Sequence, residues 1–308
     1  MLNYLVKEFD NFLSKGDPRV ANLPLMSSPF PVAAICLAYV LFVKKIGPNL
    51  MTHRKPFEVR TAMIIYNFTM VACSSFVVYT EIVYHWIQPG TSLTCDPVDY
   101  SSNPIAVRIV YNCYFYFLLK FVEFTDTLFF VVRKKNDQIS NLHVIHHGLL
   151  PFSVWWGAKF VPGGHATFFG FINSIVHVIM YTYYGLAAIG PSMKPYLWWK
   201  KYLTIFQLIQ FVAIGVHSFQ LFLQPDCSFP KIFGLWIGSH GILFWFLFSD
   251  FYRKTYNRFT ASLSSSTSSL RLSSKSSIPS ASPSSCNNQQ QQQQQQLNDS
   301  NGNFKKVN

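Results

Sequence analysis

The chain has 308 residues, of which 50% are hydrophobic, 17% aromatic and only 12% charged. Soluble domains carry about 25% charged residues, so this composition excludes an ordinary soluble domain and indicates an integral membrane protein. The net charge of +12 does not indicate a nucleic-acid partner, because the basic residues are dispersed among apolar stretches.

Residues 1–28 are mixed in polarity and lack the long apolar core of a signal peptide. Beyond them, apolar stretches long enough to cross the bilayer recur along the chain, since a spanning helix needs roughly 20 apolar residues. Seven spans are predicted, with approximate bounds 29–45, 62–86, 105–132, 142–160, 167–189, 202–224 and 231–251. The sequence therefore predicts an all-α membrane protein with its spanning domain at 29–258.

The loops between these spans alternate in charge. The first contains Lys44 and Lys45, the third contains Arg133, and the fifth contains Lys200, whereas the second, fourth and sixth contain no Lys or Arg. Because basic loops face the cytoplasm, the pattern predicts a cytosolic C-terminus and a lumenal or external N-terminal segment, residues 1–28.

Two cysteines fall in loops on the predicted lumenal side. Cys95 lies in the second loop and Cys227 in the sixth. An oxidising lumen permits a disulfide between them, and two free thiols are the alternative.

Residues 259–308 change in character. They are rich in Ser and contain a run of Gln from 289 to 296, so we expect a disordered cytosolic tail without a core. Lys305 and Lys306 lie close to the C-terminus and resemble the dilysine retrieval signal of endoplasmic reticulum membrane proteins. That signal acts on a cytosolic tail, which agrees with the charge pattern.

The third predicted span contains charged residues, which are costly at membrane depth and usually mark function. They are Lys120, Glu123 and Asp126. Lys120 and Glu123 are spaced to neutralise each other on one helix face. A buried ion pair that only fixes helix packing is the alternative interpretation.

Three histidines follow at the start of the fourth span. His143, His146 and His147 have i, i+3, i+4 spacing and share a face about 100° wide on a helix. Polar side chains also follow one face of the fifth and sixth spans, where ordinary interhelical hydrogen bonding is the alternative to a lined cavity. These residues are Asn173, His177, Met180, Tyr181 and Tyr184 in the fifth span, and Thr204, Gln207 and Gln210 in the sixth.

Three functions compete for these histidines. The HxxHH spacing is similar to that of metal-dependent membrane desaturases and hydroxylases, but those sites need more histidines than this chain places together, and His146 and His147 diverge by about 100° on a helix. A seven-span transporter or receptor is the second possibility. The third is acyl transfer, in which one imidazole accepts an acyl group and another stabilises developing charge.

Four motifs taken together resemble the ELO family of very-long-chain fatty acid elongases. They are KxxExxDT at Lys120, Glu123, Asp126 and Thr127; QxxxLHxxHH at Gln138, Leu142, His143, His146 and His147; NxxxHxxMYxYY at Asn173, His177, Met180, Tyr181, Tyr183 and Tyr184; and TxxQxxQF at Thr204, Gln207, Gln210 and Phe211. The resemblance covers about residues 25–258. Ile145 departs from it, because an aromatic residue is common there in the family.

The resemblance implies a 3-ketoacyl-CoA synthase of the endoplasmic reticulum membrane. Such an enzyme condenses a long-chain acyl-CoA with malonyl-CoA, without a bound metal or redox cofactor, and passes its product to a ketoacyl reductase, a dehydratase and an enoyl reductase. It also implies six helices forming a barrel around an acyl-chain tunnel, with a seventh outside and the Cys95–Cys227 bridge at the far end.

The same resemblance implies roles for the residues in the motifs. His146 is the candidate acyl acceptor, His177 lies close to it, and His143 and His147 orient groups or share protons. The remaining residues are candidates for binding substrate, namely Lys120, Glu123, Asp126, Gln138, Asn173, Tyr181, Tyr184, Gln207 and Gln210.

Overall fold

The computed structural model describes residues 1–257. The chain divides into two units, Met1–Lys254 and Thr255–Asn308, and the first of them contains the predicted spans and motifs. The predicted tail at 259–308, with Lys305 and Lys306, lies outside the described residues.

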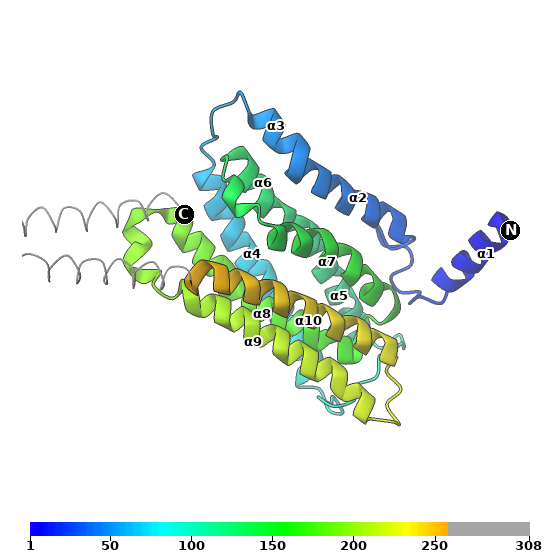
Figure 1. The fold of residues 1–308 in the computed structure, drawn as a ribbon. Helices are drawn as coiled ribbons and strands as arrows, with labels where there is room; N and C mark the ends of the chain where they lie inside the picture. Colours follow the sequence, from blue (N-terminus) through cyan, green and yellow to red (C-terminus); the bar gives the residue numbers. More distant parts are fainter. Residues whose placement is uncertain (258–308) are drawn as a thin grey trace, which may run out of the picture. The chain divides into compact units, whose positions relative to one another are not determined.

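The described residues form helices and turns without a β-strand, which confirms the all-α prediction (Figure 1). The longer helices are α1 (Leu2–Leu13), α2 (Pro29–Leu41), α4 (Arg60–Glu81), α5 (Pro104–Val122), α6 (Phe124–Val132), α7 (Asn141–Phe160), α8 (Thr167–Ile189), α9 (Lys200–Phe219) and α10 (Lys231–Tyr252). Short elements connect or extend them, namely η1 (Phe42–Ile46), α3 (Gly47–Met51), η2 (Ile82–Trp86), η3 (Asn136–Gln138), η4 (Gly164–Ala166), η5 (Pro191–Tyr196), η6 (Gln220–Leu223) and η7 (Arg253–Asn257).

Within residues 1–257, five helical segments are long and apolar enough to cross a membrane, so the chain is a multi-pass membrane protein. They are Pro29–Met51, Arg60–Trp86, Gly164–Ile189, Lys200–Leu223 and Lys231–Tyr256. The other two predicted spans correspond to α5 with α6 and to α7. They are not among the five; α5 contains Arg108 and Lys120, and α7 contains three histidines and Lys159.

The long helices pack in pairs. Helix α4 packs along α8, α9 packs between α8 and α10, and α7 contacts both α2 and α5. Figure 1 shows α8, α9 and α10 running side by side. One apolar core, formed by α2, α5, α7 and the segment before α2, contains the buried side chains of Val32, Phe117 and Trp155.

Two helix boundaries determine where the histidines and the charged residues lie. The Ser140 side chain caps α7 by accepting a hydrogen bond from the His143 amide at 3.2 Å, which satisfies one of the free donors of the first turn. The third predicted span is divided at Glu123, which ends α5 and precedes α6. The three histidines therefore lie in the first two turns of a capped helix, and the charged residues lie at a helix junction.

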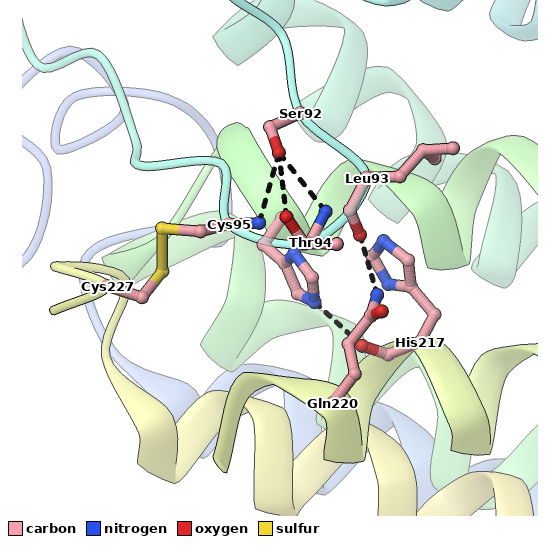
Figure 2. Close-up of a disulfide and its surroundings, with 8 residues drawn as sticks. Ser92, Leu93, Thr94, Cys95, His217, Gln220 and Cys227 are labelled. Atoms are coloured by element: carbon pink, nitrogen blue, oxygen red, sulfur yellow. Dashed lines mark hydrogen bonds between the residues drawn. A yellow bond between two sulfur atoms is a disulfide. The ribbon is translucent and has the colours of Figure 1, made fainter. Parts of the chain in front are cut away.

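One end of the helix bundle is closed by loops. Cys95, in the loop after η2, forms a disulfide with Cys227, in the loop before α10, at a Cα–Cα distance of 5.6 Å (Figure 2). Figure 2 also shows Gln220 donating a hydrogen bond to the Leu93 carbonyl oxygen, at 2.6 Å. These two links fasten the loop before α5 to the loop between α9 and α10.

Candidate functional site

Glu123 is the centre of a buried polar cluster at the α5–α6 junction. Its side chain is 1% exposed, accepts a hydrogen bond from the Lys120 ammonium at 2.5 Å, and lies 3.2 Å from His177 Nδ1 on α8. An ionised carboxylate is tolerated at such depth only when it is paired and hydrogen-bonded, and both conditions are met here. The Lys120–Glu123 pair predicted from spacing is therefore present, and a third helix joins it.

Asn173 connects Lys120 to a neighbouring tyrosine. Its Oδ1 atom accepts hydrogen bonds from Lys120 Nζ at 3.1 Å and from the Tyr116 hydroxyl at 2.7 Å. Lys120 also lies over the Tyr116 ring, 4.4 Å from its centroid. The ammonium of Lys120 is thus held by a carboxylate, an amide and an aromatic face, all of them buried.

Two of the three histidines of α7, His143 and His147, lie toward the α5–α6 junction. His143 contacts Thr127 Oγ1 through Nε2 at 2.8 Å, and Thr127 in turn contacts the Tyr39 hydroxyl at 2.8 Å. His147 Nδ1 lies 3.9 Å from Glu123 Oε2, which is beyond hydrogen-bonding distance. The rings of His143 and His147 are close, with centroids 4.4 Å apart.

His146 turns toward α10 instead. Its ring centroid lies 4.7 Å from that of Phe244 and 6.0 Å from that of Phe248. Among the described residues its buried Nδ1 atom has no hydrogen-bond partner. It still borders the same cluster, because its ring lies 5.3 Å from that of His147.

Asp126 is held by two tyrosines. Its Oδ2 atom accepts hydrogen bonds from the Tyr181 hydroxyl at 2.7 Å and from the Tyr66 hydroxyl at 3.1 Å. Tyr181 is a predicted site residue on α8, whereas Tyr66 lies on α4 and was not predicted. Tyr39 and Tyr116 were missed too, because nothing distinguishes them from the other tyrosines of an aromatic-rich chain whose Tyr count is 16.

Other predicted residues lie farther from this cluster. Gln138 is half-buried in η3 and makes none of the hydrogen bonds that join the cluster, and Tyr184 is 40% exposed near the end of α8. On α9, the Gln207 amide nitrogen lies 3.5 Å from the Met180 sulfur, and Gln210 is buried. The structure thus brings together Lys120, Glu123, Asn173 and the four histidines 143, 146, 147 and 177, with Asp126 and Tyr181 beside them.

A cavity adjoins the cluster on the side of the disulfide-linked loops. Its volume is about 70 Å³, which is smaller than the 300–1,000 Å³ typical of small-molecule sites. Its lining is mostly apolar and includes Tyr116, Val154, Gly157, Phe169 and Trp236, from α5, α7, α8 and α10. Tyr116 belongs to both the polar cluster and the cavity lining, since its hydroxyl donates to Asn173 while its side chain lines the cavity.

The hydrogen bonds of the cluster determine what its histidines can do. A carboxylate 3.2 Å from His177 Nδ1 favours the tautomer with the proton on that atom, which leaves Nε2 free to accept a proton or a hydrogen bond. Across the described residues, no three His, Cys, Asp or Glu side chains are arranged to hold a metal ion. The arrangement supplies imidazole nitrogens for proton or acyl transfer, next to a cavity with a mostly apolar lining.

Comparisons with known proteins agree with the motifs. The family model described as "ELO: GNS1/SUR4 family" matches residues 24–263. The chain is 52% identical to "Very long chain fatty acid elongase 7" of Drosophila melanogaster, over 83% of this chain and 78% of that protein. It is also 47% identical to "Very long chain fatty acid elongase 7" of Rattus norvegicus, over 82% and 90% of the two chains, and 45% identical to "Very long chain fatty acid elongase 1" of Homo sapiens, over 82% and 91%.

Proposed function

Since the chain belongs to the ELO family of very long chain fatty acid elongases and is a 3-ketoacyl-CoA synthase, we propose that the cluster around Glu123 is its condensing site. The observation that carries this proposal is the contact of Glu123 with both Lys120 and His177, next to the histidines of α7. The substrates we propose are a long-chain acyl-CoA and malonyl-CoA, with no bound cofactor.

The first half of the reaction is acyl transfer to the protein. The unprotonated ring nitrogen of His146 attacks the thioester carbonyl of the acyl-CoA, and the carbon–sulfur bond breaks. Coenzyme A leaves as a thiol, with the proton that the other ring nitrogen of His146 gives up. His146 suits this role because it borders the other histidines while its ring packs on Phe244 and Phe248. Apolar surroundings keep water from hydrolysing an acyl-imidazole.

The second half joins two carbons to the acyl group. Loss of carbon dioxide from malonyl-CoA leaves an enolate, whose carbon attacks the acyl carbon while the bond to the histidine nitrogen breaks. The products are carbon dioxide, 3-ketoacyl-CoA and free His146, which regains one proton from the solvent, so the atoms balance without an oxidant or reductant. His177 is the candidate for stabilising the enolate as an imidazolium, whose Nε2–H donates to the enolate oxygen while the Glu123 carboxylate balances its charge. His143 and His147 are candidates for sharing protons.

The remaining site residues divide into two groups in this proposal. Lys120 and Asn173 hold Glu123 in place, because their polar atoms are already engaged with it or with each other. Asp126 and Tyr181 support the same region through their own hydrogen bond. Four residues remain candidates for contacts with the coenzyme A portions of the substrates, because those portions lie outside the buried cluster. They are Gln138, Tyr184, Gln207 and Gln210.

For the membrane arrangement we propose seven spans, six of them forming a barrel around an acyl-chain tunnel. The cavity beside Tyr116 is the part of the tunnel nearest to the site, and the Cys95–Cys227 loops lie at its far end. The proposed location is the endoplasmic reticulum membrane with a cytosolic C-terminus, supported by the alternation of basic loops. A ketoacyl reductase, a dehydratase and an enoyl reductase would then act on the product.

The test uses microsomes that express the chain, supplied with labelled malonyl-CoA and a series of acyl-CoAs. We expect a two-carbon extension by the wild type and none by His146→Ala. The matched control is His53→Ala, which changes an exposed histidine outside the cluster. If no acyl-CoA is extended by the wild type, the condensation proposal is wrong, and if iron or zinc chelators abolish extension, a metal-dependent site replaces it.

A further inference from the structure

Helix α1 carries its apolar side chains on one face. Leu5, Val6, Phe9, Phe12 and Leu13 fall within an arc of about 120° on a helix that advances about 100° per residue. Polar residues occupy the opposite face, among them Lys7 and Asn11. The helix is therefore amphipathic, although it is too short to cross a bilayer.

This apolar stripe is covered at one end and uncovered at the other. Toward the C-terminal end of α1, Phe12 packs against Phe160 with ring centroids 5.0 Å apart, and Leu13 is buried in the core shared with α2 and α7. Toward the N-terminal end, Leu5 is 57% exposed and Val6 is 51% exposed. The protein itself therefore covers only half of a continuous apolar face.

The segment after α1 is fastened to one end of the helix bundle. The Asp17 amide donates a hydrogen bond to the Lys159 carbonyl at 2.7 Å, and Trp155 donates one to the Leu25 carbonyl at 2.7 Å. Arg19 donates to the Ser101 carbonyl at 2.7 Å, just before α5 begins. These bonds hold the base of α1 at the level where α2 and α5 begin and α7 ends, which is the edge of the membrane-spanning region.

The uncovered stripe continues onto the surface of a membrane-spanning helix. Phe9 lies 5.5 Å from Phe30, ring centroid to ring centroid, and Phe30 is 68% exposed at the beginning of the candidate span Pro29–Met51. Figure 1 shows α1 next to the beginning of α2. If Pro29–Met51 crosses the bilayer, an exposed ring at its first turn would face lipid near the membrane surface, and the neighbouring stripe of α1 would lie at a similar depth.

We propose that α1 is an interfacial helix that lies in the membrane surface, with Leu5 and Val6 inserted at the boundary between headgroups and acyl chains. Amphipathic helices bind at this depth with the polar face toward water. A second copy of the chain is the weaker candidate for covering the stripe, because a stable protein interface buries about 800 Å² on each partner. The few exposed side chains at the free end of α1 offer much less than such an area.

Photo-crosslinking of the full chain in its native membrane tests this proposal. An aliphatic diazirine amino acid replaces Val6 in one variant and Lys7 in another, so the two probes are adjacent in sequence but lie on the apolar and the polar face respectively. A third variant with the probe at Val216, which is 65% exposed on the candidate span Lys200–Leu223, provides the signal of a lipid-facing position. After irradiation, mass spectrometry separates lipid adducts from protein adducts.

We expect lipid adducts at position 6 in a yield similar to that at position 216, and at least about fivefold above that at position 7. Equal lipid yields at positions 6 and 7 would overturn the proposal. A cross-linked protein as the main product at position 6 would overturn it too, and the mass of that product would show whether a second copy covers the stripe. Because the readout is an adduct rather than activity, the outcome does not depend on the proposed condensation mechanism.

Discussion

Glu123 Oε1 and His177 Nδ1 lie 3.2 Å apart, which joins the α5–α6 junction to the middle of α8. The same carboxylate holds Lys120 and lies near His147, so residues from three helices share one buried charge. Removing the carboxylate would therefore affect both the chemistry and the packing of these helices.

Glu123→Gln is expected to lower kcat for condensation by about 100-fold or more, the usual contribution of a positioned acid or base. Gln cannot hold the proton on His177 Nδ1 in the same way, and it leaves the Lys120 ammonium without its counter-charge. The measurement is steady-state elongation in membranes with saturating acyl-CoA and malonyl-CoA. A variant with unchanged kcat would show that Glu123 has only a packing role.

The double variant Lys120→Met with Glu123→Gln separates these two roles. Leaving one buried charge unpaired costs about 3–5 kcal/mol, whereas replacing both members of a pair is often close to neutral. We therefore expect the double variant to recover thermal stability relative to Glu123→Gln but not activity. Recovery of both would mean that the pair is structural.

Gly157→Leu is expected to shorten the longest product. A Cβ atom built at Gly157 meets no atom within 4 Å, and this residue lines the cavity beside the site, so a Leu side chain would take up cavity space. Gly215→Leu is the matched control, since a Cβ atom there also meets no atom within 4 Å but Gly215 does not line the cavity. Product lengths from a saturated acyl-CoA series, measured by mass spectrometry, check the prediction; the same length distribution from both variants would contradict it.

Tyr66→Phe removes one of the two hydrogen bonds to Asp126 and leaves the other from Tyr181. A single hydrogen bond contributes about 1–3 kcal/mol when its loss leaves a buried polar group with fewer partners. We expect a lower unfolding temperature in detergent with condensation largely retained. Tyr79→Phe, at a tyrosine that is 57% exposed on the same helix, is the control and should change neither quantity.

Cys227→Ser is expected to destabilise the protein, by about 2–4 kcal/mol if the spanning region unfolds as one unit. The disulfide joins residues that are 132 apart in sequence and fastens two loops at one end of the bundle. Cys73→Ser, at a free thiol, should leave the unfolding temperature unchanged. Unfolding of both variants and the wild type, with and without reductant, gives the comparison; a wild type insensitive to reductant would argue against the contribution of the disulfide.

The membrane class, the helices and the pairing of Lys120 with Glu123 could be predicted from sequence, because each depends on composition or on spacing along one helix. The gathering of His177 and Asn173 with Glu123 required the packing of α8 against α5, which periodicity does not give. The resemblance to a family supplied that link, since its motifs name residues on separate helices together.

Tyr66 and Tyr184 show why the rest could not be predicted. Tyr66 stands in an apolar helix and becomes a site neighbour only because α4 packs beside α8 and its hydroxyl reaches Asp126. Tyr184 shares the helical face of His177 but is 40% exposed. Periodicity gives the direction of a side chain around its helix, whereas its depth in the bundle depends on where the neighbouring helices end.

The Ser140 cap has a consequence for how this site can change over evolution. Because the cap fixes the residue at which α7 begins, it also fixes the angle at which each histidine leaves the helix. Inserting one residue between the cap and His143 would rotate all three imidazoles together by about 100° relative to Ser140. The interval between Ser140 and the histidines is thus constrained in length even where its side chains are free to vary.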